Sequence, residues 1–229
     1  MHWYTRIVKL FFATSTIPDG SMKSPDHDFA AVLPARTAFL QKNGSAPADT
    51  TLVYLTYETD DFCRYQTVVD GDKGDGITRR PTIEADALVV TQPGHALLLP
   101  LADCIGAVIH DPVKNILMVS HLGRHNLEQL GGTKSIDYLV AHHDVDPATV
   151  TVWLSPAAGK DSYPLYGFDN RGLHEVAIEQ LTVAGILRTN MTVSPINSAA
   201  DLTYFSHSKF LKGDRENDGR FAIVAMMRS

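Results

Sequence analysis

A thiol and an imidazole each follow an apolar run of the sequence. Residues 97–101 lead to Cys104, and residues 116–119 lead to His121. Apolar runs of this length are typical of buried strands, so each reactive group stands just past a strand end. The two groups can form a nucleophile and its general base, or they can supply sulfur and nitrogen to zinc. In either case we expect Asp103 to orient or charge-balance the site.

A catalytic zinc site requires a third protein ligand and an open position for water. Cys63, in the segment DDFCRY, is the candidate third ligand. The alternative is a packed thiol, since free cysteines are among the most buried residues. The predicted metal ligands are therefore Cys104, His121 and Cys63, and the predicted catalytic groups are Cys104, His121 and Asp103.

Arg124, His125 and Arg79 are the candidates for binding substrate or an anion. A guanidinium holds phosphate or carboxylate through forked hydrogen bonds. Arg79 lies in the polar, glycine-rich stretch 70–81 (DGDKGDGITRRP), which we expect to be a loop or a mobile flap that partly covers the site. The alternative is that these arginines are ordinary surface residues.

The composition is that of a globular protein with a sizeable core. The chain has 229 residues, 44% of them hydrophobic and 20% charged, and we expect a single domain over residues 1–229. A net charge of −6 and the lack of a basic stripe argue against a nucleic-acid partner. Two cysteines form no disulfide framework and fit a reduced, cytoplasmic setting.

No apolar window approaches the roughly 20 residues that span a bilayer, so we expect no membrane partner. The apolar stretch LFFA, after Arg6 and Lys9, is too short for a signal sequence. The expected partner is a small-molecule substrate, and the expected assembly is a monomer or a small homo-oligomer.

The pattern of apolar runs predicts an α/β or α+β fold with a layered mixed β-sheet and flanking helices. Near-continuous apolar runs indicate strands that are covered on both faces. Strands are expected at 51–56, 87–91, 96–101, 116–119 and 150–154, with two more at the C-terminal end in LTYFSHSKF and RFAIVAMM. Helices are expected in AAVLPARTAFLQKNG, at 135–142, and after Asp169 and Asn170 as far as Gly185.

Four segments together resemble the YfiH-like family, which is also called the multicopper polyphenol oxidase or laccase-domain family. They are EADALVVTQPG, LPLADCIGAVIHDP, ILMVSHLGR and the terminal DLTYFSHSKFLKGDRENDGRFAIVAMM. The resemblance extends from about residue 11 to the end. It implies a layered α/β fold similar to the catalytic domain of cytotoxic necrotising factor, a cysteine–histidine deamidase.

The resemblance also implies a zinc site and a range of activities. In this family, zinc is held by the cysteine of ADC (Cys104), the histidine of HAGWR (His121) and a histidine in a QVH motif. Members are associated with phosphorolysis of purine nucleosides and with deamination, including that of adenosine and methylthioadenosine. Bacterial relatives are also linked to peptidoglycan editing.

The chain departs from the family at three places. Where relatives read QVH it reads TYET, and an ungapped match puts Thr59 in the place of the histidine. Where relatives read HAGWRG it reads HLGRHN, which puts Arg124 in the place of the tryptophan and His125 in the place of the arginine. The cysteine-rich GPxCC stretch is replaced by SPAAGKDSYPLY.

These observations predict a zinc-dependent enzyme of the purine nucleoside phosphorylase or adenosine deaminase type. The substrates would be adenosine or methylthioadenosine, together with phosphate. One alternative is a Cys–His amide hydrolase of the peptidoglycan-editing type, and another is a non-catalytic descendant of the fold. Copper-dependent oxidation is disfavoured, because it requires more histidines than cluster in this sequence.

Overall fold

The computed structural model describes residues 8–23 and 28–229. Arg6, in the stretch predicted not to be a signal sequence, lies outside the described residues, as does part of the loop predicted around residues 19–28. Within the described part of the chain, no helix combines the length and the apolar character needed to cross a membrane.

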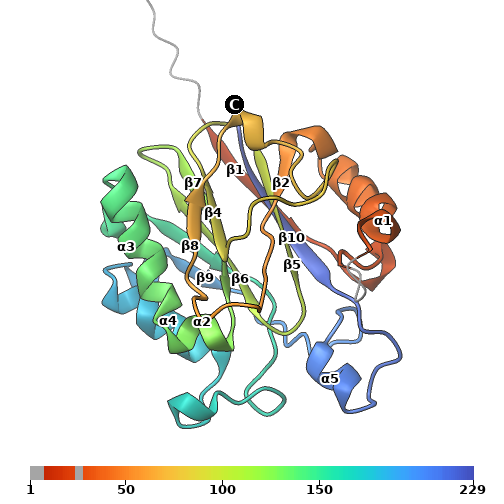
Figure 1. Cartoon of the computed structure of the whole chain (residues 1–229). Coiled ribbons are helices and arrows are strands. Elements are labelled where there is room, and N and C mark those ends of the chain that lie inside the picture. Colours follow the sequence, from red (N-terminus) through yellow and green to blue (C-terminus); the bar gives the residue numbers. More distant parts are fainter. Residues whose placement is uncertain (1–7, 24–27) are drawn as a thin grey trace, which may run out of the picture.

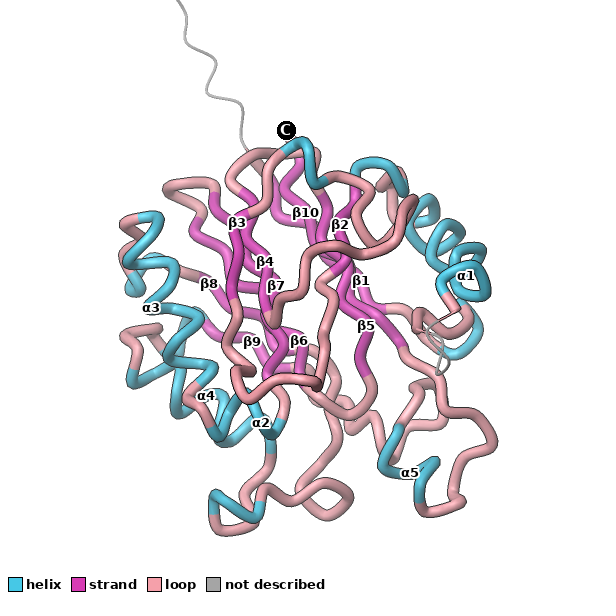
Figure 2. The backbone as a smooth tube through the Cα atoms, in the orientation of Figure 1, coloured by secondary structure: helices cyan, strands magenta, loops and turns pink. Residues whose placement is uncertain are grey.

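The strands form two separate sheets (Figures 1 and 2). The four-stranded sheet has the order β1 (Lys9–Thr14), β10 (Phe221–Arg228), β5 (Ala96–Leu101) and β2 (Thr50–Leu52). The six-stranded sheet has the order β3 (Tyr65–Thr67), β4 (Ala87–Val90), β7 (Ile116–Leu122), β6 (Ile105–Asp111), β8 (Thr151–Leu154) and β9 (Met191–Val193). Both sheets are mixed, because β2, β3 and β9 pair in parallel and the other strands pair in antiparallel fashion.

The two sheets pack face to face, and helices cover their outer faces. Figure 1 shows α3 (Gly131–His143) and α4 (Leu173–Val183) beside the six-stranded sheet, and α1 (Phe29–Lys42) beside the other. Side chains alternate along each strand. On β5, Leu97, Leu99 and Leu101 fill the space between the sheets, whereas Ala96 and Leu98 pack toward α1. Three apolar cores result, one between each pair of adjacent layers.

The predicted fold class is confirmed, and most of the predicted elements are present. Five of the predicted strands correspond to β4, β5, β7, β8 and β10, and the strand predicted at 51–56 is present only as the shorter β2. The predicted helices correspond to α1, α3 and α4. The helix α1 begins at Asp28, whose side chain accepts a hydrogen bond from the N–H of Ala30 (2.9 Å), and it ends before Gly44 (φ +68°).

Two sequence interpretations were wrong. LTYFSHSKF is not a strand, because its second half forms the short helix α5 (His207–Leu211) after the capping residue Ser206. The prediction of one central sheet is also wrong, because β5 and β10 pair with each other and not with the strands at β4 and β7. Periodicity identifies apolar strands but not which sheet each one joins.

Candidate active site

Cys104 and His121 are brought together at one end of the six-stranded sheet. Cys104 directly precedes β6, and His121 lies near the end of β7. These strands are antiparallel neighbours, and the register pairs Gly106 with His121. The predicted proximity of the thiol and the imidazole therefore follows from adjacent pairing of two strands.

Gly123 marks the space between the two groups. A Cβ atom at this position would lie 2.8 Å from Nε2 of His121 and 2.9 Å from Sγ of Cys104. Both reactive atoms therefore border one small volume, which is open only because residue 123 has no side chain. Any residue other than glycine at position 123 would place its Cβ in this volume.

Neither group is ionised near neutral pH in these surroundings. Desolvation, reinforced by the charge of Asp103, raises the pKa of the Cys104 thiol to about 12, although the N–H of Arg124 and two guanidinium groups oppose the shift. Desolvation also lowers the pKa of His121 to about 4, against the opposing charge of Asp86. Both shifts favour the neutral thiol and the neutral imidazole over the thiolate and imidazolium pair that a cysteine hydrolase uses.

Asp86 supports His121 from the neighbouring strand. Its backbone carbonyl accepts the His121 N–H at 2.9 Å, and its buried carboxylate accepts a hydrogen bond from Nε of Arg64 at 2.8 Å. Arg64 also donates to the Oγ1 of Thr56 at 2.7 Å. Asp86 is therefore a fixed negative charge beside the imidazole.

A cavity of about 260 Å³ opens over these groups. Its walls carry basic side chains from three distant segments, namely Lys23, Arg124 and Arg220. They also carry aromatic and imidazole rings, namely Tyr57, Phe62, Tyr163, His125 and His207. A flat ring and an anion could both be bound here, because aromatic faces and guanidinium groups border the same space.

Arg124 and His125 both line this cavity, as predicted for substrate-binding residues. They open the short helix α2 (Arg124–Glu128). Nη2 of Arg124 lies 3.4 Å from Nε2 of His125, and the His125 ring stacks on Phe62 with centroids 4.7 Å apart. The segment HLGRHN, which stands in the place of HAGWRG, therefore places a guanidinium and a flat ring at the wall of the cavity.

Arg79, the third predicted anion-binding residue, lies elsewhere. Its guanidinium donates to the carbonyls of Lys73 (2.6 Å) and Gly71 (3.2 Å) and pairs with buried Asp75 at 3.4 Å. None of residues 71–81 lines the cavity over Cys104. The stretch 70–81 is a loop as predicted, but it is packed into the fold around Asp75 and is not a flap over the site.

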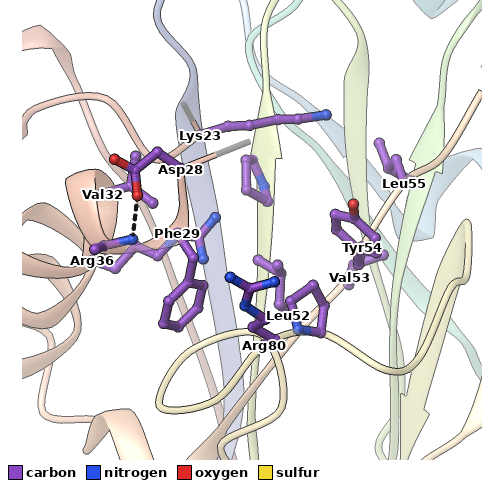
Figure 3. Close-up of a pocket in the computed structure, with 13 residues that line it drawn as sticks. Lys23, Asp28, Phe29, Val32, Arg36, Leu52, Val53, Tyr54, Leu55 and Arg80 are labelled. Atoms are coloured by element: carbon purple, nitrogen blue, oxygen red, sulfur yellow. Dashed lines mark hydrogen bonds between the residues drawn. The ribbon is translucent and has the colours of Figure 1, made fainter. Parts of the chain in front are cut away.

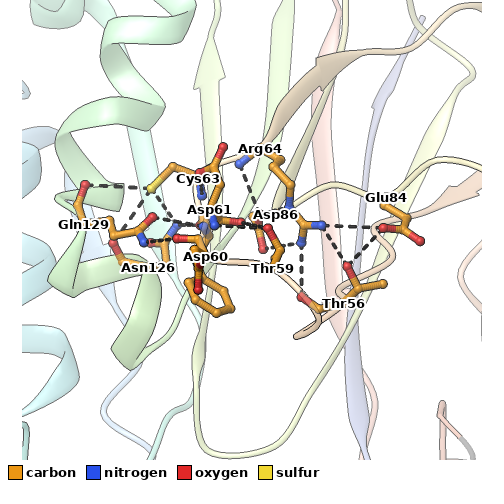
Figure 4. Close-up of polar contacts among 11 residues, drawn as sticks. Thr56, Thr59, Asp60, Asp61, Cys63, Arg64, Glu84, Asp86, Asn126 and Gln129 are labelled. Atoms are coloured by element: carbon orange, nitrogen blue, oxygen red, sulfur yellow. Dashed lines mark hydrogen bonds and ion pairs between the residues drawn. The ribbon is translucent and has the colours of Figure 1, made fainter.

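Cys63 is not gathered with Cys104 and His121. Its thiol lies 3.9 Å and 3.8 Å from the backbone oxygens of Asn126 and Gln129 (Figure 4). Within residues 8–23 and 28–229, no group of three or more His, Cys, Asp or Glu side chains is arranged to hold a metal ion. Among the described residues, the donor set for zinc therefore stops at Cys104 and His121, which is too few for the predicted zinc site.

Thr59 does not replace the missing histidine. Its Oγ1 accepts the N–H of Asp61 at 3.1 Å and shapes an exposed turn. The turn is held in place by Gln129, whose side chain accepts from the N–H of Phe62 (2.9 Å) and donates to the carbonyl of Asp60 (2.6 Å), as Figure 4 shows. The segment that aligns with the QVH motif is thus a structural turn here.

Asp103, which was expected to orient or charge-balance the site, is held by the C-terminal segment. Its carboxylate is 1% exposed and points away to the C-terminal segment, where it accepts from Oγ of Ser206 and from the N–H of Ser208, each at 2.6 Å. Its backbone is left-handed (φ 73°), a conformation that aspartate tolerates. Asp103 therefore joins the ADC turn to the FSH segment.

Figure 3 shows a second cavity, of about 480 Å³. It adjoins the first, because Lys23, Leu55 and Pro100 line both. Phe29, Tyr54 and Arg80 are among its lining residues. The site is thus one end of a longer depression between α1 and the sheets.

Several lining residues escaped the analysis of the sequence. They are Lys23, Tyr57, Asp86, Tyr163, His207 and Arg220. Asp86 and His207 lie inside segments that carried the family resemblance, which was the available signal. Arg220 lies in the same terminal segment as His207, and Tyr57 and Tyr163 lie in stretches where the chain departs from the family. Lys23 lies outside all of these segments, and only the packing of its segment brings it to the cavity.

Comparisons with known proteins agree with this architecture. Residues 24–168 match the family described as multi-copper polyphenol oxidoreductase laccase. Two solved structures share the fold. They are a hypothetical protein YfiH of Bacillus licheniformis (TM-score 0.79, 21% identity, 96% of this chain and 92% of that one) and YlmD of Geobacillus stearothermophilus (TM-score 0.80, 18% identity, 98% and 93%).

A curated protein also matches over part of the sequence. Purine nucleoside phosphorylase SCO2081 of Streptomyces coelicolor is 33% identical over 90 residues, which is 39% of this chain and 35% of that protein. The match therefore spans about a third of that relative.

Proposed function

Because the chain belongs to the multi-copper polyphenol oxidoreductase laccase family, we propose that it is an enzyme of the purine nucleoside phosphorylase type. The proposed substrates are adenosine or methylthioadenosine, together with phosphate. The partial match to a protein named purine nucleoside phosphorylase supports this class.

The cavity over Cys104 carries the proposal. It combines Arg124 and Arg220, both close enough to lower the pKa of the thiol, with the rings of Tyr57 and Tyr163. Phosphorolysis needs these two features together, since the enzyme must hold phosphate near the sugar while it binds a planar base.

The proposed reaction is a displacement at the anomeric carbon of the ribose. A phosphate oxygen, held by Arg124 and Arg220, attacks C1′ as the bond from C1′ to the purine nitrogen breaks. The electron pair of that bond leaves with the base, which then takes up a proton. The neutral Cys104 and His121 form the floor of the cavity, where they can hydrogen-bond the ribose hydroxyls.

Zinc dependence stays a prediction, because the described residues supply two of the three expected donors. The amide-hydrolase alternative is weakened because burial raises the pKa of the Cys104 thiol and lowers the pKa of His121, which disfavours transfer of the thiol proton to the imidazole. Metal content of the purified protein and of Cys104→Ala, measured by mass spectrometry, tests the zinc prediction separately from activity.

The proposed function is tested by incubating the protein with adenosine, with and without phosphate, and separating the products. We expect adenine and ribose 1-phosphate, formed only when phosphate is present. Cys104→Ala should abolish turnover, whereas the matched Cys63→Ala should retain it. Arg124→Ala should raise the KM for phosphate at least tenfold, whereas Arg171→Ala, at a surface ion pair with Glu179, should not.

Other products would identify other chemistry. Inosine would replace the proposal with deamination, and adenine formed without phosphate would replace it with hydrolysis. No product from adenosine or methylthioadenosine would overturn the proposed function in favour of an amide substrate or a binding role.

A further inference from the structure

A histidine and a carboxylate form an oriented pair at the wall of the cavity. Nδ1 of His207 lies 2.8 Å from Oδ1 of Asp218. The same Oδ1 accepts a hydrogen bond from Nη1 of Arg220 at 2.5 Å, which fixes the carboxylate. An imidazole whose Nδ1–H donates to a carboxylate has its other nitrogen, Nε2, left for a ligand.

Hydrogen bonds to one carboxylate also fix the residues on either side of His207. The carboxylate of Asp103 accepts from Ser206 on one side of His207 and from Ser208 on the other, each at 2.6 Å. Asp103 directly precedes Cys104, so one buried carboxylate ties the thiol-bearing turn to the residue that carries the imidazole.

His207 also differs from the other imidazole at the floor of the cavity. His121 is 7% exposed, whereas the His207 side chain is 42% exposed and can exchange protons with water. Both line the cavity. A group that transfers a proton in every cycle must contact both the substrate and the solvent. His207 lines the cavity and is also exposed to solvent.

We propose that His207, oriented by Asp218 and held by Asp103, is the general acid that protonates the leaving purine. This inference rests on the proposed function. As the C1′–N bond breaks, its electron pair moves onto the base, and the proton on Nε2 of the charged imidazole passes to a purine nitrogen. The ring becomes neutral, keeps its Nδ1–H on Asp218, and regains a proton from water before the next cycle.

The test compares two leaving groups. Adenosine needs protonation of its base, whereas p-nitrophenyl riboside releases a stable anion and does not. His207→Gln should lower kcat for adenosine by at least 100-fold and change that for the nitrophenyl compound by less than about threefold. Asp218→Asn should show the same selectivity to a smaller degree, and His142→Gln, at an exposed position on α3, should affect neither substrate.

Equal losses on both substrates would overturn the inference, because they would indicate a structural role. Unchanged turnover of adenosine by His207→Gln would also overturn it. A circular-dichroism melt of each variant identifies a loss that arises from unfolding.

A readout without substrate separates this inference from the proposed function. In ¹⁵N NMR spectra of the wild type, neutral His207 should be the Nδ1–H tautomer, and Asp218→Ala, which removes the acceptor, should abolish that preference. An Nε2–H tautomer in the wild type would overturn the inference even if the enzyme cleaves adenosine. If the wild type cleaves neither compound, the proposed function fails, while the tautomer still reports whether the pair is built as inferred.

Discussion

Gly123→Ala should disable the site through a single added methyl group. The new Cβ would lie 2.6 Å and 2.8 Å from Cε1 and Nε2 of His121, and 2.9 Å from Sγ of Cys104. Favourable contacts between such atoms lie at about 3.5–4.0 Å, so these groups must move by roughly 1 Å. The backbone itself tolerates alanine, because φ of Gly123 is −104°.

The strand around His121 gives little room for that movement. β7 is hydrogen-bonded to β4 on one side and to β6 on the other. Overpacking of this kind costs about 1–3 kcal/mol of unfolding free energy. A displacement of about 1 Å at reacting groups lowers turnover by about 100-fold.

Urea unfolding and adenosine phosphorolysis measure the two effects. Gly71→Ala is the matched control, because nothing lies within 4 Å of its added Cβ, and it should match the wild type in both assays. If Gly123→Ala also kept wild-type stability and turnover, the close convergence of Cys104 and His121 on this point would be wrong.

Three further predictions concern groups around the site and in the core. Cys63→Ala should leave bound metal and turnover unchanged, because the thiol lies against backbone oxygens and the amide of Asn126 and does not line the cavity; loss of metal on mass spectrometry would restore it as a ligand. His95, buried against Thr51 (2.7 Å), has its pKa lowered from 6.5 to about 4 by desolvation. The unfolded chain therefore binds the extra proton first, and stability that is complete above about pH 6.5 should fall by up to about 3 kcal/mol as the pH drops toward 4. His95→Gln should flatten that part of the profile in urea titrations, and an unchanged slope would contradict the assignment. Arg64→Met should cost about 3–5 kcal/mol, because it leaves Asp86 buried without its partner; adding Asp86→Asn should recover part of the loss, and additive losses in the double variant would refute this coupling.

The sequence was most informative where chemistry and periodicity coincide. Cys104 and His121 were both found from the apolar runs beside them, but the run before Cys104 is β5, which lies in the other sheet. The two groups meet because β6, a strand that was not predicted, begins at Ile105 and pairs with β7. Arg79 was misplaced because a guanidinium in a glycine-rich loop has the same sequence signature whether it binds a ligand or its own backbone. Its partner Asp75 becomes visible only when the loop folds.

The role of Asp103 could not be read from its neighbour in the chain. Its position beside Cys104 predicted a role in orienting or charge-balancing the site, but not that its carboxylate accepts from Ser206 and Ser208, about a hundred positions away. Contacts at such separation depend on how β5 and β10 pair, and no local pattern encodes that pairing.

The place of β10 between β1 and β5 has a consequence for how the protein is made. All strands of the six-stranded sheet have been synthesised once the ribosome has passed Val193. The four-stranded sheet lacks β10, which lies between β1 and β5, until residues 221–228 have been synthesised. Until then the leucines of β5 lack their central neighbour and are exposed to aggregation or to chaperones. His207 and Arg220 emerge in the same late stretch, so a nascent chain has no complete cavity.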